Sequence, residues 1–444
     1  MGRRSLSRTL GVWANGLRVG RWTIPTSGAM EFSYDATWVA SEGARPISLS
    51  LPINLDGAPI KGERVGFFFD NLLPDSDTIR QRLRSRFKTR SGDSFDLLEA
   101  VGRDCVGAIQ LLPEAKDPEG VHTIDARPLT DREVEKLLLG AVSPEAIVAE
   151  DDDFRMSIAG AQEKTALLWH DGRWCKPHGA TPTTHIFKLP LGLVGGRQLD
   201  LSESLENEWL CAQILTEYGV PVAPCEVMNF GTAKALVVTR FDRQLHSSGR
   251  YWLRLPQEDF CQAIGIPSSL KYEADGGPGL TAIARVLQGS ESRDDDLATL
   301  LRAQLIFWML AATDGHAKNF SIRLLARGRF RLTPLYDVLS AWPVTGPRQN
   351  QIHPKKLKLA MAMHGESKHY RVEEISRRHF NMTARRCGLG ADMEPLIADV
   401  ITRTPSVIAA VGARLPTGFP SKLFSSVTTG LQKAAQKIES MASG

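Results

Sequence analysis

The chain has 444 residues, of which 42% are hydrophobic and 23% are charged. These values are typical of folded globular proteins, and they exclude a disordered chain or a small disulfide-stabilised scaffold. The 54 basic and 50 acidic residues give a net charge of +4, which is too small for a protein that coats nucleic acid through its overall charge. Any contact with DNA therefore needs a local patch.

Cysteine spacing and apolar stretches indicate the compartment. The six cysteines are scattered and include no CxxC pair, so they predict neither a disulfide framework nor a zinc site, and they favour a reducing environment. The basic segment 1–16 is interrupted by Gly11 and Asn15 before an apolar core of signal-peptide length. The apolar stretch 305–312 is far shorter than the roughly 20 residues of a membrane span. We expect a cytoplasmic protein without membrane association.

The amino-terminal part carries both strand and helix signals. Asn15-Gly16 lies between two half-apolar segments in 11–24 and predicts a β-hairpin. Pro74 and Asp75 can begin a helix that carries several arginines. We therefore expect a small β-rich domain with added helices.

A change in composition marks a domain boundary near residue 145. Ser143-Pro144 is followed by an acidic run from Glu150 to Asp153, as at an exposed junction. Beyond the boundary the order is a strand hairpin, another strand, and an amphipathic helix in 202–220 capped by Ser202 or Ser204. The most apolar helix, 294–315, is expected at the centre of a larger helical lobe.

Polar residues with oxygen-bearing side chains follow this apolar helix. Asp314 is followed five positions later by Asn319, and a hairpin with its turn at 326–328 leads to a second carboxylate, Asp337. The hairpin should return Asp337 to the place where the chain left Asn319. Oxygen ligands from few protein residues are what Mg²⁺ needs when substrate phosphates supply the rest. The pattern therefore predicts phosphoryl transfer.

The order Asp314, Asn319, hairpin, Asp337 resembles the catalytic loop and metal-binding Asp of protein kinases. Lys188, late in a strand, matches the phosphate-pairing lysine of a kinase small lobe, and Glu206 or Glu208 on the next helix is its candidate partner. The chain lacks a GxGxxG before the lysine, has Ala-Thr-Asp for His-Arg-Asp, and has no Phe-Gly after the second Asp. A conventional eukaryotic-type kinase is therefore excluded.

These departures point to one family, because several long motifs together look like HipA, the serine/threonine kinase toxins of bacterial toxin-antitoxin pairs. The motifs are SIAGAQEKTALL, PTTHIFKLP, RLPQEDFCQ, DGGPG, TDGHAKNFS and LTPLYD, with ARPISLSLP and FFDNLLPDS in the amino-terminal part. The resemblance covers nearly the whole chain. It implies an α+β fold, in which a small β-rich domain (1–145) precedes a bilobal protein-kinase-like domain with a small lobe (146–255) and a mainly helical large lobe (256–444).

The resemblance also implies an activity and partners. The implied activity is that of an ATP-dependent kinase that phosphorylates an aminoacyl-tRNA synthetase, typically the glutamyl enzyme. This reaction would inhibit translation and cause growth arrest or persistence. A helix-turn-helix, HipB-like antitoxin would neutralise the kinase and bring it to operator DNA. Two other functions remain open at this point, a catalytically idle corepressor that acts only with the antitoxin and a small-molecule kinase on a related fold.

Site residues follow from the resemblance position by position. Asp314 would be the catalytic base, Asn319 and Asp337 the magnesium ligands, and Ser157 an inactivating autophosphorylation site beside acidic residues 151–153 that would repel a phosphate. The implied ATP contacts are Ala159, Gly160, Ala161, Gln162, Glu163, Lys164, Lys188, Thr239, Arg240, Phe241, His316, Lys318, Asn319 and Tyr336.

A locally basic segment is the candidate DNA contact. Lys368, His369 and Arg371 align roughly with the region by which the family contacts operator DNA. The same residues are interpreted equally well as an ordinary solvent-exposed surface. His364, His369 and His379 form no HxH or HxxxH pair, and we expect them to be ordinary surface histidines rather than metal ligands.

Overall fold

The structure is a computed structural model that describes residues 7–142, 162, 164–196 and 198–442. These residues form two compact units. The first contains the chain up to Leu189 together with Met228–Ser269 and Ile322–Phe330, and the second contains Pro190–Val227, Leu270–Ser321 and the chain from Arg331 onward. Each unit combines segments from more than one predicted domain, so the three-domain division stays a prediction.

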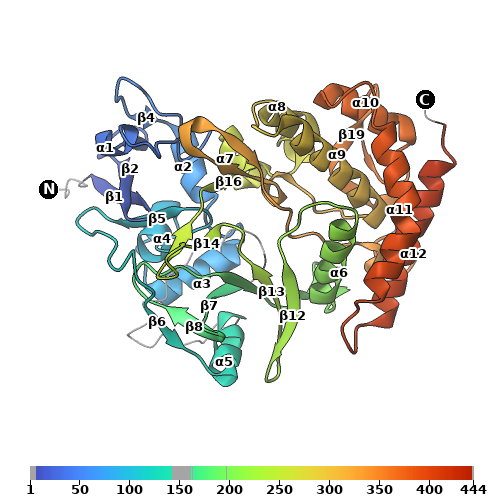
Figure 1. The fold of residues 1–444 in the computed structure, drawn as a ribbon, viewed down its shortest axis with the longest axis horizontal. Helices are drawn as coiled ribbons and strands as arrows, with labels where there is room; N and C mark the ends of the chain where they lie inside the picture. The colour runs from blue at the N-terminus through green and yellow to red at the C-terminus, as the bar shows by residue number, and fades with distance from the viewer. Residues whose placement is uncertain (1–6, 143–161, 163, 197, 443–444) are drawn as a thin grey trace. The chain divides into compact units, whose positions relative to one another are not determined.

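An antiparallel sheet begins the first unit (Figure 1). Its strand order is β4-β3-β2-β1-β5, with bounds β1 Arg8–Ala14, β2 Leu17–Ile24, β3 Glu31–Tyr34, β4 Ile60–Lys61 and β5 Ile109–Pro113. The turn between β1 and β2 is Asn15-Gly16, and both residues have positive φ angles of 48° and 84°. Such turns match the right-handed twist of paired strands. The predicted hairpin is therefore confirmed.

Helices pack on this sheet and complete its core. They are α1 (Ala36–Val39), α2 (Glu63–Asp70), α3 (Asp77–Phe87) and α4 (Ser94–Val101). Trp22 of β2 stacks on Phe69 of α2 with ring centroids 4.1 Å apart, and Phe95 of α4 lies 4.9 Å from the same indole. The arginine-rich helix begins later than predicted, because Ser76 is its N-cap and accepts a hydrogen bond from the Ile79 amide.

A second sheet has six strands in the order β12-β13-β9-β7-β8-β6. Their bounds are β6 Ala126–Pro128, β7 Lys164–His170, β8 Arg173–Pro177, β9 His185–Lys188, β12 Cys225–Phe230 and β13 Ala233–Thr239, and α5 (Asp131–Val142) packs against β7 and β13. Trp174, Phe187 and Phe230 contribute to its core. The β7–β8 hairpin and the β9 strand agree with the prediction, and β9 carries Lys188 at its last position.

Short elements follow this sheet along the chain or form the hairpin between Asn319 and Asp337. They are β14 (Arg243–Leu245), β15 (Trp252–Arg254), β16 (Gln257–Asp259), α7 (Phe260–Ile264), β17 (Ser321–Leu324) and β18 (Phe330–Leu332), and β16, β17 and β18 form a sheet in that order. A capping box starts α7, in which Asp259 and Gln262 each bond the other's backbone amide. The hairpin predicted between Asn319 and Asp337 is confirmed.

The second unit is mainly helical (Figure 1). Its helices are α6 (Ser204–Glu217), α8 (Leu280–Leu287), α9 (Arg293–Leu310), α10 (Arg377–Cys387), α11 (Glu394–Gly412) and α12 (Ser421–Glu439), and its strands pair as β10 (Gly192–Val194) with β11 (Leu199–Leu201) and β19 (Lys358–His364) with β20 (Lys368–Arg371). Helix α9 contacts α6, α8, α10, α11 and α12, and all its residues from Ala303 to Leu310 are buried, so it forms the predicted centre.

The helix predicted in 202–220 is confirmed, but its predicted caps are wrong. Its N-cap is Glu203, which makes no side-chain capping bond. The Ser204 hydroxyl instead accepts a hydrogen bond from the Leu191 amide at 3.0 Å, because Ser204 is buried against the preceding hairpin. The helix start is therefore fixed by tertiary contacts.

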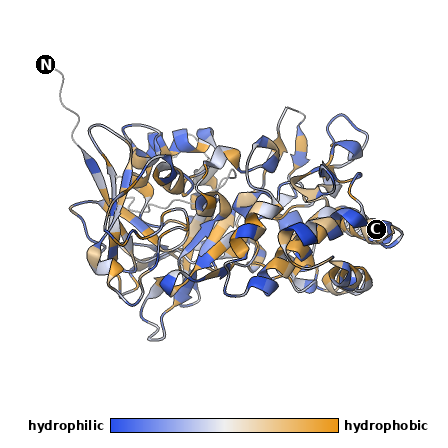
Figure 2. Cartoon of the chain, turned by 90° about the horizontal axis from the view of Figure 1, so that it is seen from above, coloured by the Kyte–Doolittle hydropathy of each residue, from blue (hydrophilic) through white to orange (hydrophobic). Residues whose placement is uncertain are grey.

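Amphipathic spacing explains how the peripheral helices pack. In α12, Leu423, Val427, Leu431 and Ile438 recur at helical spacing and are buried. Figure 2 shows the corresponding mixture of hydrophobic and hydrophilic residues along the helices. No helix in the described part of the chain is long and apolar enough to cross a membrane.

Candidate active site

The loop after α9 positions the predicted catalytic base. Ala311 ends the helix in a left-handed conformation with φ of 48°, and the Ala312 amide donates to the Phe307 carbonyl at 2.8 Å. The next residues turn tightly, since the His316 amide donates to the Asp314 carbonyl at 2.8 Å. A Cβ on Gly315 would lie 2.6 Å from the Phe307 ring, so only glycine fits between Asp314 and the core.

Asp314 is exposed and has one side-chain partner that the sequence did not predict. The Tyr272 hydroxyl donates to Asp314 Oδ1 at 2.5 Å. The Tyr272 ring also meets the ring of His316 edge to face, with centroids 5.0 Å apart. The carboxylate is therefore held in one orientation by a phenol that is itself positioned by packing.

The predicted metal ligands are brought together. The Asn319 side-chain nitrogen donates to the backbone carbonyl of Asp337 at 3.0 Å, although 18 positions separate the two residues. Asp337 has a positive φ of 64°, which is uncommon for a residue other than glycine and concentrates at functional sites. The hairpin thus returns Asp337 to Asn319, as the spacing predicts.

This pair fits a magnesium ion. Because the Asn319 amide nitrogen is used by the Asp337 carbonyl, the amide oxygen is the atom of Asn319 that can ligate a metal. Together with the Asp337 carboxylate it offers hard oxygen donors from only two side chains, a set that Mg²⁺ accepts when water and phosphates complete its coordination.

Tyr336 and Lys318 join the same cluster. The Tyr336 hydroxyl donates to the Lys318 carbonyl at 2.9 Å and also bonds the Ser321 hydroxyl. His316 and Lys318 are buried, with 6% and 7% of their surface exposed. Predicted residues of the catalytic and metal loops therefore lie within one hydrogen-bonded group in the second unit.

Helix α6 is attached directly to the segment after Asp337. The Asn207 side chain donates to the Ser340 carbonyl at 2.8 Å and accepts from the Ser340 amide at 3.0 Å. Glu206 and Glu208, the neighbours of Asn207 on α6, are both buried. Which of them partners Lys188 stays open. The residue that fixes α6 on the segment after Asp337 is Asn207, which sequence reasoning missed.

Lys188 belongs to the first unit. It lies opposite Lys164 on β7 and Leu236 on β13, and only 5% of its surface is exposed. A buried lysine at the end of a central strand is an unusual and costly placement, as expected for a functional cation. Its role with nucleotide stays a prediction.

The predicted adenine-binding segment lies beside a buried ionic network. The Arg240 guanidinium bonds both carboxylate oxygens of Asp242 at 2.9 and 2.8 Å, and Arg243 donates to Asp104 at 2.9 Å. The Arg240 side chain therefore stabilises the fold through these ion pairs. The predicted nucleotide contact at this position would be made by the Arg240 backbone. The neighbouring Phe241 carbonyl accepts a hydrogen bond from Arg323.

Most of the predicted phosphate loop lies outside the described residues. This holds for Ala159, Gly160, Ala161 and Glu163, and also for the predicted autophosphorylation site Ser157, which precedes the loop. Gln162 is described, and its side-chain nitrogen donates to the Leu189 carbonyl at 2.5 Å, next to Lys188. Lys164 follows as the first residue of β7.

The candidate DNA-contact residues all have partners within the chain. Lys368 forms an ion pair with the buried Glu273 at 2.8 Å, Arg371 pairs with Glu374 at 3.1 Å, and His369 stacks on His379 with ring centroids 3.9 Å apart. These contacts neither require nor prevent binding to DNA, which stays a prediction.

The expectation of ordinary surface histidines is wrong for two positions. His364 and His379 are 4% and 3% exposed, because β19 and α10 pack against each other. Burial, together with the nearby His369 and Arg378, lowers the pKa of His379 to about 4. No metal-binding cluster of histidine, cysteine or acidic residues occurs in the part of the chain that the structure describes.

Comparisons with known proteins identify the family. The sequence profile of the HipA-like C-terminal domain matches residues 156–408, and that of the HipA N-terminal domain matches residues 10–112. The chain belongs to the HipA family. Asp314, Asn319 and Asp337 therefore lie within the range that matches the HipA-like C-terminal domain.

Relatives cover most of this HipA chain. Y4mE of Sinorhizobium fredii, which carries a provisional kinase name, is 33% identical over 80% of this chain and 82% of its own length. The serine/threonine-protein kinase toxin HipA of Shewanella oneidensis is 28% identical over 87% of both chains. A solved structure of Shewanella oneidensis HipA, in complex with HipB and operator DNA, aligns with a TM-score of 0.78 at 23% identity, covering 97% of this chain and 98% of that one. The predicted α+β, kinase-like fold class is confirmed.

The residues missed by sequence reasoning carry a weak signal. Tyr272 and Glu273 lie just before the DGGPG motif, which marks the family but does not show what its neighbours touch. Gly277 and Gly279 leave no room for a Cβ, which would lie 1.8 Å from the Leu270 carbonyl oxygen and 2.1 Å from the Glu273 carboxyl. The glycines therefore fold the segment so that Tyr272 reaches Asp314 and Glu273 is buried.

Proposed function

We propose that this protein is a serine/threonine kinase toxin that transfers the γ-phosphate of ATP to an aminoacyl-tRNA synthetase of the glutamyl type. Such a reaction would inhibit translation and cause growth arrest or persistence. The observation that carries the proposal is the hydrogen bond from the Asn319 side chain to the Asp337 backbone carbonyl, which brings together the two residues predicted to hold a kinase-type metal ion. Membership of the HipA family and the kinase name of the Shewanella relative support it.

Each group has a task in this proposal. Asp314 accepts a hydrogen bond from the acceptor hydroxyl and orients it, while Tyr272 fixes the rotation of the carboxylate. Lys188 pairs with the nucleotide phosphates. When bound at Asn319 and Asp337, Mg²⁺ supplies charge neutralisation on those phosphates. The catalytic effect is mainly positioning and electrostatic stabilisation.

We propose autophosphorylation of Ser157 as the means of self-inactivation. The serine precedes the predicted phosphate loop and follows the acidic residues 151–153 closely. A phosphate there would be repelled by these carboxylates and displace the loop. The segment lies outside the described residues, and the proposal rests on the sequence and the family resemblance.

A HipB-like antitoxin and operator DNA are the proposed partners. The Shewanella HipA structure contains HipB and operator DNA, and β20 of this chain carries the basic residues that align roughly with the DNA-contact region. We propose that DNA contact occurs mainly through the antitoxin. The site of action would be the cytoplasm, where synthetases and DNA are found.

The test is phosphorylation of purified synthetases. The protein is incubated with ATP, Mg²⁺ and each aminoacyl-tRNA synthetase of the host, and phosphopeptides are identified by mass spectrometry. Phosphate on the glutamyl enzyme, absent with Asp314→Asn, supports the proposal. Phosphate on another synthetase corrects the substrate, and no modified synthetase at all overturns the assignment. Growth arrest that persists with Asp314→Asn would also contradict it.

A further inference from the structure

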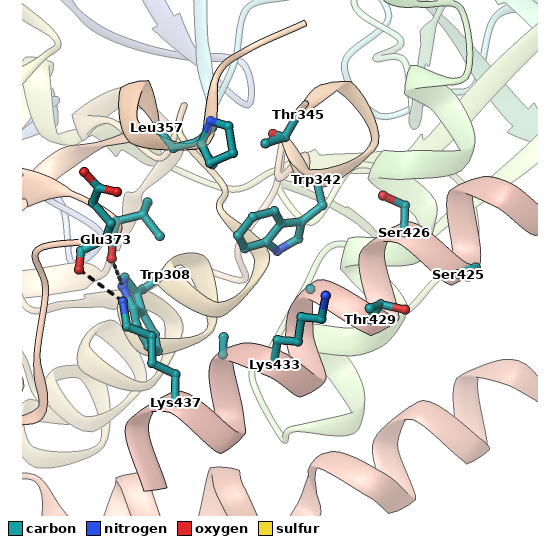
Figure 3. A pocket seen from close by; sticks show the side chains of 14 residues that line it. Trp308, Trp342, Thr345, Leu357, Glu373, Ser425, Ser426, Thr429, Lys433 and Lys437 are labelled. Carbon is teal, nitrogen blue, oxygen red and sulfur yellow. Dashed lines mark hydrogen bonds between the residues drawn. The ribbon is translucent and has the colours of Figure 1, made fainter. Parts of the chain in front are cut away.

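A pocket of about 440 Å³ lies in the second unit beside α12, and its lining includes none of the predicted catalytic and metal-binding residues described above (Figure 3). Its walls come from the end segment of α9, the turn Trp342–Val344, the segment before β19 and one face of α12. This volume is in the range of small-molecule sites. None of its lining residues has a role in the proposed kinase reaction.

Two indoles give the pocket rigid aromatic walls. Trp342 donates from its indole nitrogen to the Met309 carbonyl at 2.8 Å, and Trp308 donates likewise to the Val372 carbonyl at 2.9 Å. Gly430 on α12 lies directly against Trp342, because a Cβ there would be 2.4 Å from the indole. Leu357 and Val372 add apolar surface. A flat aromatic ligand would find a prearranged surface.

Polar groups of α12 line the opposite side. Ser426, Thr429 and Lys433 recur at helical spacing and therefore share one face of the helix. In Figure 3 the Lys433 side chain extends from α12 toward Trp342. No hydrogen bond or ion pair with another described residue engages the Lys433 amine, so it can bind a ligand.

The charges of the lining favour an anion. Lys437, one turn after Lys433, donates to the Glu373 carbonyl at 3.1 Å and lies 5.5 Å from the Trp308 ring centroid, so its amine is already used. The lining holds two lysines and one glutamate, a net charge of +1. A cationic ligand would be repelled, whereas a carboxylate could pair with Lys433 and accept hydrogen bonds from the neighbouring hydroxyls.

We propose that this pocket binds a small planar aromatic carboxylate, with its ring against Trp342 and its carboxylate on Lys433. Thr429 and Ser426 lie on the same face and would donate hydrogen bonds to the anionic group. The site differs from that of the proposed kinase reaction, since its lining shares no residue with the predicted catalytic and metal-binding set. The proposed ligand has two required features, a planar aromatic ring and a single negative charge.

The test uses 2-naphthoate and its neutral counterpart 2-naphthamide, which share the ring system and differ in charge. Isothermal titration calorimetry of the full chain should show binding of one naphthoate, tighter than binding of the amide. Lys433→Gln should weaken naphthoate binding at least about fivefold, because a charge-assisted contact is lost, and should leave the amide within about twofold. Gly430→Ala should weaken both, because its methyl group displaces the Trp342 indole.

Lys422→Gln is the matched control, since Lys422 is exposed in the first turn of the same helix and does not line the pocket. It should bind naphthoate like the unmodified protein. Thermal unfolding identifies any variant that fails to fold. The proposal is overturned if folded protein binds no naphthoate at concentrations up to about 5 mM, which is well above the dissociation constant of a specific small-molecule site. Equal affinities for naphthoate and naphthamide, or no effect of Lys433→Gln, would overturn it as well.

Discussion

The hydroxyl of Tyr272 donates a hydrogen bond to Asp314 Oδ1 at 2.5 Å, so the predicted catalytic base is held by a residue 42 positions earlier in the chain. Tyr272→Phe removes this hydrogen bond and keeps the ring that packs on His316. A hydrogen bond to a charged group contributes about 1.5–3 kcal/mol, so we expect kcat to fall about 10-fold or more. Steady-state kinetics should show this with an unchanged KM for ATP.

The Tyr272→Phe experiment separates two effects of the hydroxyl. A lower kcat with unchanged thermal unfolding means that the phenol positions the carboxylate. A higher kcat would mean that the hydroxyl occupies the place of the acceptor and blocks the base, which would contradict the positioning role. An inactive unmodified protein would instead contradict the kinase assignment itself.

Asp337→Asn tests the proposed metal ligand. Asparagine tolerates the left-handed backbone that Asp337 adopts, so the fold should be retained. We expect phosphoryl transfer to fall by at least about 100-fold, because electrostatic stabilisation at the phosphates is lost. Binding of a non-hydrolysable ATP analogue, measured by calorimetry, should weaken far less. Equal losses of transfer and binding would argue against a metal-ligand role for Asp337.

The buried network around Asp104 predicts a large stability effect. Asp104 accepts hydrogen bonds from Arg243 at 2.9 Å and from the Thr183 hydroxyl at 2.6 Å, and the adjacent arginines keep its pKa well below the usual range despite burial. Asp104→Ala would leave buried guanidinium groups without this carboxylate and should cost about 3–5 kcal/mol. Thermal unfolding measures the change.

The matched control for Asp104 is Glu374→Ala. Its carboxylate pairs with Arg371 at 3.1 Å, but about half of each side chain is exposed. Such a surface pair contributes about 0–1 kcal/mol. If Glu374→Ala lowers the unfolding midpoint as much as Asp104→Ala does, the buried network contributes no more to stability than a surface ion pair.

Glu258 makes stability depend on pH. Burial raises the pKa of this carboxyl to about 8, and the nearby Asp259 acts in the same direction. The folded chain therefore favours the protonated form, so this contribution to stability is complete below the ordinary pKa of 4.5 and is lost as the pH rises through about 8. Glu258→Gln keeps an acceptor for the Leu49 amide and has no charge to bury.

Thermal unfolding of the unmodified protein and Glu258→Gln should therefore diverge with pH. We expect the unfolding midpoint of the variant to rise relative to that of the unmodified protein between about pH 5 and pH 8. The relative rise should reach at least about 2 °C at pH 8. A difference between the two midpoints that stays constant over this range would show that Glu258 does not titrate within it.

Local signals in the sequence predict much of this fold. Asn15-Gly16 marks its hairpin because both residues accept positive φ, and the apolar run of α9 marks the central helix. The spacing of Asn319 and Asp337 predicts their contact because a hairpin returns the chain to its starting point. These features depend on residues close in sequence.

Features that depend on distant segments were not predictable in this way. Ser204 looks like a helix cap but bonds the Leu191 amide, because tertiary packing overrides the local capping signal. His379 lies in a charged stretch and is nevertheless buried under β19. The partners Tyr272 and Asn207 are set by which helices and loops pack together, and no local spacing encodes that.

The central claim is that this HipA-family chain transfers phosphate from ATP. Intact-mass spectrometry of the protein before and after incubation with ATP and Mg²⁺, followed by peptide mapping, tests it most directly, with Asp314→Asn and Ser157→Ala as controls. The account predicts the gain of one phosphate on Ser157 in the unmodified protein and no gain in either variant. Protein that starts unphosphorylated and gains no phosphate on itself, and none on any synthetase in the same reaction, would contradict it.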